Sequence, residues 1–184
     1  MPLTASDDCV LIVIDAQPGF YPPELPAEDR ARAAQALDRA VWLSTVAGRL
    51  AVPIVVTEEE PELNGTTDPR LAPEAPRFVK PTFGLAGTPE ILAAVRATGR
   101  PTAVLVGFET DVCVLQSAIG LLDDGLRVIA VEDAIFSPGE MHERGLARMR
   151  DAGARLTHCK ALGYEWARTV ERSSALLRPA PFRL

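Results

Sequence analysis

Three residues of the chain, Asp15, Lys80 and Cys113, are chemically suited to nucleophilic catalysis. A thiol can attack an electrophilic carbon, and a carboxylate beside it can take its proton. An ammonium group between them stabilises the ionised forms and can polarise a substrate carbonyl. Each residue also has an ordinary explanation, because a cysteine can fill core space, an aspartate can cap a turn and a lysine can lie in solvent. The chemistry therefore depends on whether the fold brings the three together.

Cys113 stands where an apolar strand, ending near residue 106, gives way to a helix whose apolar residues recur three and four positions apart. Thr110 and Asp111 are residue types that accept the free amide hydrogens of a helix start. A helix N-terminus favours a nearby anion and can lower a cysteine pKa from roughly 8.5 to between roughly 3.5 and 7.5. We therefore predict a thiol that ionises easily, with a buried structural cysteine as the alternative.

Strands and helices alternate along the chain, which predicts a three-layer α/β/α fold with a central, mostly parallel six-stranded sheet. We expect one domain over residues 1–184 and the Rossmann-like strand order 3-2-1-4-5-6. The Pro- and Glu-rich stretch 58–76 is interpreted as a site-forming loop rather than a mobile excursion. The expected strands cover 10–14, 53–57, 77–79, 102–106, 127–131 and 154–158, and the expected helices cover 26–50, 89–98, 139–152 and 162–173, with a further helix around Cys113.

The predicted topology explains how the three reactive residues would meet. In an open parallel sheet, ligands bind beyond the carboxyl ends of the strands, where the strand order reverses. Asp15 closes the first strand, Lys80 follows the third, and Cys113 follows the fourth by a few residues. Because the first and fourth strands are neighbours in this order, Asp15 should lie close to Cys113.

Composition excludes several classes of protein. A net charge of −6 with scattered basic residues does not predict nucleic-acid binding. No apolar run approaches the roughly 20 residues of a membrane span, and the N-terminus lacks a secretory pattern, so we expect a cytoplasmic protein. Three widely spaced cysteines predict neither a disulfide framework nor a zinc ribbon. Cys9 and Cys159 lie in strand-like stretches and are expected to be structural.

The motifs together resemble those of the isochorismatase-like cysteine hydrolases over nearly the full length. They are Asp15-Ala16-Gln17 after an apolar strand, Lys80 followed by Phe83, and Gly107-x-x-Thr110-Asp111-x-Cys113. The resemblance implies a triad in which Cys113 is the nucleophile, Asp15 the general base and Lys80 the electrostatic partner. It also implies a cis peptide between Phe108 and Glu109, an oxyanion hole formed by the amides of Glu109 or Thr110 and of Cys113, and a homo-oligomer.

The chain departs from the family in ways that narrow the expected substrate. Residues 57–61 carry no histidine where the nicotinamidase branch has an Asp-x-His metal motif, so we expect no metal and no cofactor. Isochorismate is a poor first choice, because the members that cleave its vinyl ether typically lack the cysteine. Glu109 stands where many relatives have a small apolar residue. It either faces the pocket and selects a cationic or hydrogen-bond-donating substrate, or points into solvent.

Further substrate contacts are assigned to Gln17, Phe20, Tyr21 and Phe83, although the aromatic residues are equally compatible with ordinary packing. His142 is interpreted as the exposed start of a helix and not as the base. The sequence thus predicts a metal-independent cysteine hydrolase that cleaves a C–N bond of a small amide through a thioester. The alternatives are a relative acting on another electrophile and a catalytically silent small-molecule binder or interaction protein on the same fold.

Overall fold

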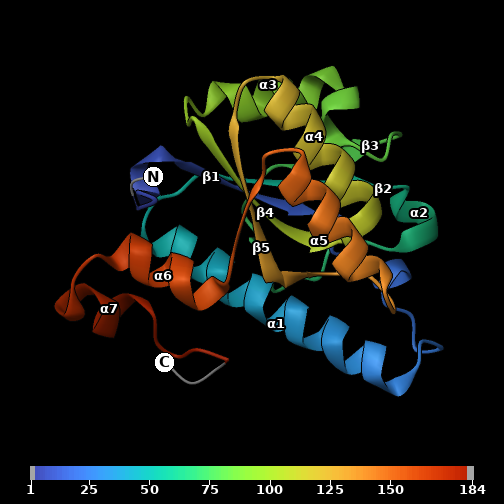
Figure 1. Cartoon of the computed structure of the whole chain (residues 1–184), viewed down its shortest axis with the longest axis horizontal. Helices are drawn as coiled ribbons and strands as arrows, with labels where there is room; N and C mark the ends of the chain where they lie inside the picture. The colour runs from blue at the N-terminus through green and yellow to red at the C-terminus, as the bar shows by residue number, and fades with distance from the viewer. Residues whose placement is uncertain (1–2, 182–184) are drawn as a thin grey trace.

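The structure is a computed structural model that describes residues 3–181, arranged around one six-stranded sheet (Figure 1). The strand order is β3-β2-β1-β4-β5-β6 and every neighbouring pair is parallel, which confirms the predicted topology. The strands are β1 (Cys9–Ile14), β2 (Ile54–Glu59), β3 (Arg77–Lys80), β4 (Thr102–Phe108), β5 (Arg127–Phe136) and β6 (Arg155–Thr157).

Helices cover both faces of the sheet, so that β1 is buried along its whole length and consists only of apolar residues. Alternate residues of β1 face opposite layers: Leu11 and Val13 belong to one apolar cluster, and Ile12 and Ile14 to the other. The first layer contains α1 (Ala27–Arg49) and α6 (Cys159–Ala167), with α7 (Val170–Leu176) beside α6; the second contains α3 (Pro89–Ala97), α4 (Leu115–Asp123) and α5 (Met141–Asp151).

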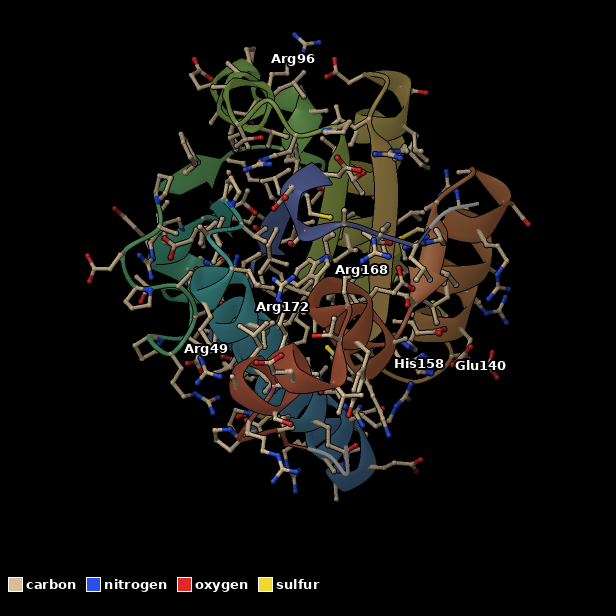
Figure 2. All side chains as sticks on the ribbon, turned by 90° about the vertical axis from the view of Figure 1, so that its left-hand side faces the viewer. Arg49, Arg96, Glu140, His158, Arg168 and Arg172 are labelled. Atoms are coloured by element: carbon tan, nitrogen blue, oxygen red, sulfur yellow. The ribbon has the colours of Figure 1, made fainter. Side chains whose placement is uncertain are left out.

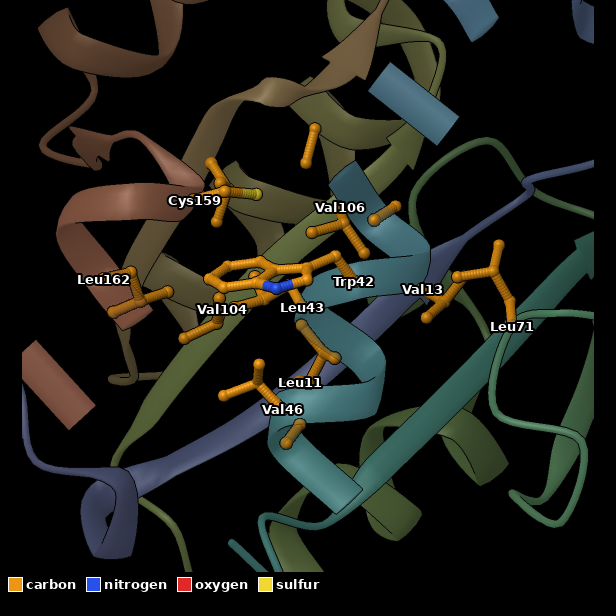
Figure 3. Packing of buried hydrophobic residues seen from close by; sticks show 14 of the residues in the cluster. Leu11, Val13, Trp42, Leu43, Val46, Leu71, Val104, Val106, Cys159 and Leu162 are labelled. Carbon is orange, nitrogen blue, oxygen red and sulfur yellow. The ribbon is translucent and has the colours of Figure 1, made fainter. Parts of the chain in front are cut away.

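Trp42 of α1 joins the sheet to the C-terminal helices. Its ring lies among Leu11 and Val104 of the sheet and Leu162 of α6 (Figure 3). The indole Nε1 donates a hydrogen bond of 3.0 Å to the Leu177 carbonyl, which provides the polar partner that a buried tryptophan needs.

Several element boundaries differ from the prediction. The helix expected over 162–173 begins at Cys159 and is broken at Arg168, whose φ of 65° is left-handed, before α7 begins. Cys159 is therefore the first residue of a helix and not part of a strand. Strand β5 runs on to Phe136, past a register shift against β4, and β2 runs on to Glu59. A short helix, α2 (Pro61–Asn64), occupies part of the predicted loop.

The surface carries most of the charged side chains. Figure 2 shows Arg96 and Glu140 at the periphery, and both are exposed, as is Arg49. Within residues 3–181, no helix has the length and apolar character that a bilayer crossing requires. Asp15 and Lys80 are exceptions to this distribution, because both are completely buried.

Candidate active site

Asp15 directly follows β1, the central strand between β2 and β4. Its φ of 46° is left-handed, so the chain turns out of the strand at this residue. The Thr57 hydroxyl donates a hydrogen bond of 2.8 Å to Oδ1, and the Asp15 amide donates one of 3.1 Å to the Thr57 carbonyl. The carboxylate is therefore fixed against β2 with its second oxygen, Oδ2, directed away from Thr57.

Lys80 reaches Asp15 from the edge of the sheet. It is the last residue of β3 and is aligned with Glu59 of β2, two strands away from β1. Two inter-strand spacings amount to roughly 10 Å, a distance that only a long side chain can cross. Nζ lies 2.6 Å from Asp15 Oδ2 and donates a hydrogen bond of 3.0 Å to the Thr82 carbonyl. The contact with Oδ2 is a direct ion pair, although no N–H is aligned for a hydrogen bond to that oxygen.

Cys113 lies on η4 (Thr110–Val114), a single π-helical turn between β4 and α4. Such turns are rare and frequently occur at functional sites. The absence of a side chain at Gly107 lets β4 approach β1 closely. A Cβ at this residue would lie 1.9 Å from the Ile14 carbonyl oxygen. Cys113 is 2% exposed, and its thiol donates a hydrogen bond of 3.7 Å to Glu59 Oε2. The thiol and the carboxylates of Asp15 and Glu59 all lie within 4.8 Å of one another.

The ionisation of Cys113 contradicts the prediction of a lowered pKa. Burial raises the pKa of the thiol, the nearby Asp15 carboxylate raises it further, and Lys80 opposes the rise only partly. Burial also raises the pKa of Asp15, against the opposing effects of Lys80 and Thr57. The resting thiol is therefore neutral at neutral pH, because it loses its proton far less readily than an ordinary cysteine. Nucleophilic attack from this state requires the thiol proton to move during the reaction.

The peptide between Phe108 and Glu109 is cis, as the resemblance implied. The Glu109 carbonyl accepts the amides of Val112 and Val114. Thr110 is fully buried, and within residues 3–181 no acceptor is recorded for its backbone N–H. A buried amide without a partner is uncommon and is a suitable donor for a negatively charged oxygen.

His142 is the second residue of α5, so it lies at a helix start as predicted, but the predicted exposure of its side chain is wrong. The side chain is nearly buried, and Nδ1 is 2.9 Å from the Thr110 hydroxyl. Burial lowers the pKa of His142, which keeps the ring neutral. The imidazole thus holds the turn that carries Cys113 and supports it from α5.

The predicted substrate contacts occupy different surroundings. Gln17 is fully buried, and its side-chain amide bonds to the backbone of Glu59 and Gly65, which fastens the end of β2 to the following loop. Tyr21 packs edge-on against Phe108, with ring centroids 5.2 Å apart. Phe20 is partly buried against the α1-side core, whereas Phe83 is 52% exposed. Glu109 is half-buried, between the two predicted orientations.

Glu59 is a residue of this cluster that the sequence analysis missed. It lies within the run of three glutamates at 58–60, which offers no signal to distinguish one from another. Only the register does so, because it aligns Glu59 with Lys80 at the carboxyl ends of β2 and β3.

The three acidic ligand atoms of Asp15, Glu59 and Cys113 are close enough to surround a metal ion. The ammonium of Lys80 already stands 2.6 Å from Asp15 and provides the positive charge there. A divalent cation bound to the same carboxylate would be repelled by that ammonium. The donor set is therefore a poor fit to a metal.

Known proteins are similar to this chain in sequence and in fold. The model of the isochorismatase domain matches residues 9–160. Isochorismatase domain-containing protein 2A of Mus musculus is 33% identical over 159 residues, which cover 85% of this chain and 73% of the mouse protein. The chain spans 58 to 61% of the length of similarly named proteins from Xenopus laevis and Rattus norvegicus.

Two solved structures have closely similar folds. The YcaC gene product of Escherichia coli, described as an octameric hydrolase of unknown specificity, has a TM-score of 0.83 at 23% identity, covering 96% of this chain and 88% of that one. YcaC from Pseudomonas aeruginosa, described with hexane-2,5-diol and covalent acrylamide, has a TM-score of 0.82 at 25% identity, covering 95% and 89%. Because the family match extends from β1 to the start of α6 and includes every residue of the buried cluster, the chain belongs to the isochorismatase family.

Proposed function

We propose that this protein is a metal-independent cysteine hydrolase that cleaves the C–N bond of a small amide through a thioester on Cys113. The observation that carries the proposal is the closed cluster in which the Cys113 thiol lies within 4.8 Å of a carboxylate that is itself paired with Lys80 at 2.6 Å. The family match and the hydrolase descriptions of similar structures support the reaction class.

In the first half-reaction, Asp15 accepts the thiol proton while Sγ attacks the amide carbon. The C–N bond then breaks, and the amine leaves with the proton that Asp15 returns to it. In the second half-reaction, water attacks the thioester, Asp15 accepts a proton from that water, and the carboxylic acid leaves as the thiol is restored. The raised pKa of Cys113 makes this base necessary, since little thiolate is present beforehand.

Lys80 and the backbone of η4 stabilise the charges that develop. The ammonium keeps the fully buried Asp15 ionised, because burial without a cation would favour the protonated carboxyl. The unbonded Thr110 amide, together with that of Cys113 or Glu109, binds the oxyanion of the tetrahedral intermediate. Each such donor typically lowers the activation free energy by roughly 2.7 to 4 kcal/mol.

Two solved relatives support the proposal further. The covalent acrylamide described for the P. aeruginosa relative supports a reactive nucleophile in this fold, because acrylamide alkylates thiols through its C=C bond. Assembly into a homo-oligomer is supported by the octamer described for the E. coli relative. We also propose that the substrate is a small molecule and that the protein acts in the cytoplasm.

The test is to capture the thioester. The protein is mixed with a panel of small primary amides, quenched in acid and analysed by peptide mass spectrometry, while released ammonia is measured in parallel. Acylation should be confined to Cys113. Cys113→Ala should lower the rate of ammonia release by roughly three orders of magnitude or more. Cys159→Ala is the matched control, because Cys159 is also buried and should be dispensable.

A folded protein that releases no ammonia and carries no adduct on Cys113 across the panel would contradict the proposal. If such an inactive protein still bound amides, the catalytically silent small-molecule binder would be favoured. Acylation from esters or nitriles alone would favour the relative that acts on another electrophile.

A further inference from the structure

Two carboxylates near η4 have no cation of their own. Glu59 is partly buried at the end of β2, and its Oε2 lies 3.7 Å from Sγ. Glu109 is half-buried immediately before η4. Among the described residues, no arginine, lysine or histidine forms an ion pair with either side chain, and for Glu109 no side-chain hydrogen bond is recorded. We call Glu59 and Glu109 the acidic rim.

The neighbouring acids differ from the acidic rim because each has its donors within the protein. Asp15 is paired with Lys80 and bonded to Thr57. Glu58 accepts the Thr67 amide at 2.8 Å and lies 3.9 Å from Arg77. The structural roles in this region are therefore filled by other carboxylates.

The acidic rim is costly to the protein in the absence of a ligand. Partial burial removes water from a carboxylate, and two carboxylates near one another repel. Burial raises the pKa of Glu109, and the negative charges of Asp111 and Glu59 raise it further. A positively charged group between them would relieve both effects.

We propose that the acidic rim selects a substrate that carries a protonated amine or amidinium beside the scissile amide, with Glu59 as the main specificity-determining residue. The inference rests on the proposed function and names its substrate class. Because Glu59 Oε2 lies only 3.7 Å from Sγ, a carbonyl carbon at Sγ and a cation at Oε2 must be joined by a short spacer. A short amino-substituted primary amide meets this requirement.

The first experiment compares two amides of the same shape and different charge. β-Alaninamide is protonated at neutral pH, and butyramide replaces its ammonium with a methyl group. A charge-assisted hydrogen bond predicts a preference of roughly 10- to 100-fold in kcat/KM for the cation. In Glu59→Gln the preference should fall by about tenfold, mainly through the KM of the cationic amide. Glu109→Gln should give a smaller decrease.

The matched control is Glu62→Gln, which removes the same charge from an exposed residue of α2 three positions along the chain. This variant should keep the full preference. Glu59→Gln should still fold, because Gln17 and Asn64 bind the Glu59 backbone and not its carboxylate. A thermal melt verifies this before the kinetics are compared.

A second experiment needs no substrate. The cationic 2-aminoethyl and anionic 2-sulfonatoethyl methanethiosulfonates each transfer a thioalkyl group to a thiol, forming a disulfide and releasing methanesulfinate. Cys113 should react at least about tenfold faster with the cationic reagent, and Glu59→Gln should reduce that ratio while Glu62→Gln leaves it intact. Peptide mass spectrometry assigns the modified cysteine.

The outcomes separate the inference from the proposed function. Equal reaction with both reagents, unchanged in Glu59→Gln, overturns the acidic rim as a charge filter while the cysteine hydrolase stands. A preference that Glu62→Gln removes as fully as Glu59→Gln also overturns it, because general surface charge would then be the cause. A folded protein in which Cys113 takes neither reagent, with no thioester from any amide, overturns both.

Discussion

Two regions of the molecule combine a carboxylate, a cation and a buried thiol, and we propose a catalytic role for only one of them. The first is the cluster of Asp15, Lys80 and Cys113. The second consists of Asp133 on β5, Arg39 on α1 and Cys159 at the start of α6, where Arg39 Nε lies 3.4 Å from Asp133 Oδ2. The residue types alone do not distinguish the two regions.

Their hydrogen bonds differ. In the second region, Asp133 Oδ1 accepts the Cys159 backbone amide at 2.8 Å, so the carboxylate holds the first turn of α6. The Cys159 thiol donates to the Arg39 carbonyl at 3.6 Å. Its surroundings are apolar, beside Trp42 and Leu162 (Figure 3). These groups stabilise the docking of α6 onto α1.

Burial raises the pKa of both thiols, Cys113 and Cys159, so a perturbed pKa does not identify the reactive one. The two regions differ in the partners of the carboxylate that lies near each thiol. Asp15 is bound to a hydroxyl and an ammonium, which leave it free to take a proton from Cys113, whereas Asp133 is committed to a backbone amide. We therefore expect the other hydrogen-bond and ion-pair partners of a carboxylate to decide whether it can act as the base.

The largest expected effect separates Asp15→Asn from Asp133→Asn. Loss of a general base should lower kcat by roughly 10²- to 10⁴-fold in Asp15→Asn, while the Asp133 variant keeps its rate because an asparagine oxygen still accepts the Cys159 amide. Activity in the parent protein requires ionised Asp15, whose pKa is raised by burial. It should therefore fall as pH decreases through a value above the ordinary 3.9 or so. Steady-state kinetics against pH measures both effects, and an unchanged acid limb in Asp15→Asn would refute the assignment.

The next effect concerns stability and compares Lys80→Met with Arg39→Met. Lys80→Met leaves a fully buried carboxylate without its cation and should lower the free energy of unfolding by about 3 to 5 kcal/mol. The Arg39 ion pair is partly solvated, so its loss should cost about 1 kcal/mol or less. Urea denaturation with both variants tests this. Equal losses would show that the Asp15–Lys80 pair is not the more strongly coupled one.

The smallest effect is expected from metal removal. Because the Lys80 ammonium supplies the positive charge beside Asp15, extensive dialysis against EDTA should leave kcat/KM unchanged, and added zinc should not raise it. Metal content measured on the same samples provides the control. Loss of activity that zinc restores would instead show that Asp15, Glu59 and Cys113 act as ligands.

The strand order and the meeting of Asp15, Lys80 and Cys113 could be predicted, because apolar runs bounded by helices leave few parallel topologies. Boundaries were less predictable. The break at Arg168 depends on one left-handed residue, and Cys159 begins a helix because Asp133, 26 residues earlier, accepts its amide. Contacts between distant segments of this kind leave no local pattern.

The sequence by itself determined the apolar periodicity, the sheet order and the positions from which three reactive residues leave the strands. Only the tertiary structure decided that Glu59, and not Glu58 or Glu60, stands beside the thiol, and that His142 supports Thr110. It also decided the protonation of Cys113, since burial and neighbouring carboxylates outweigh the helix start. The physical reason is that desolvation and charge interactions depend on distances across the fold, which residue order along the chain does not specify.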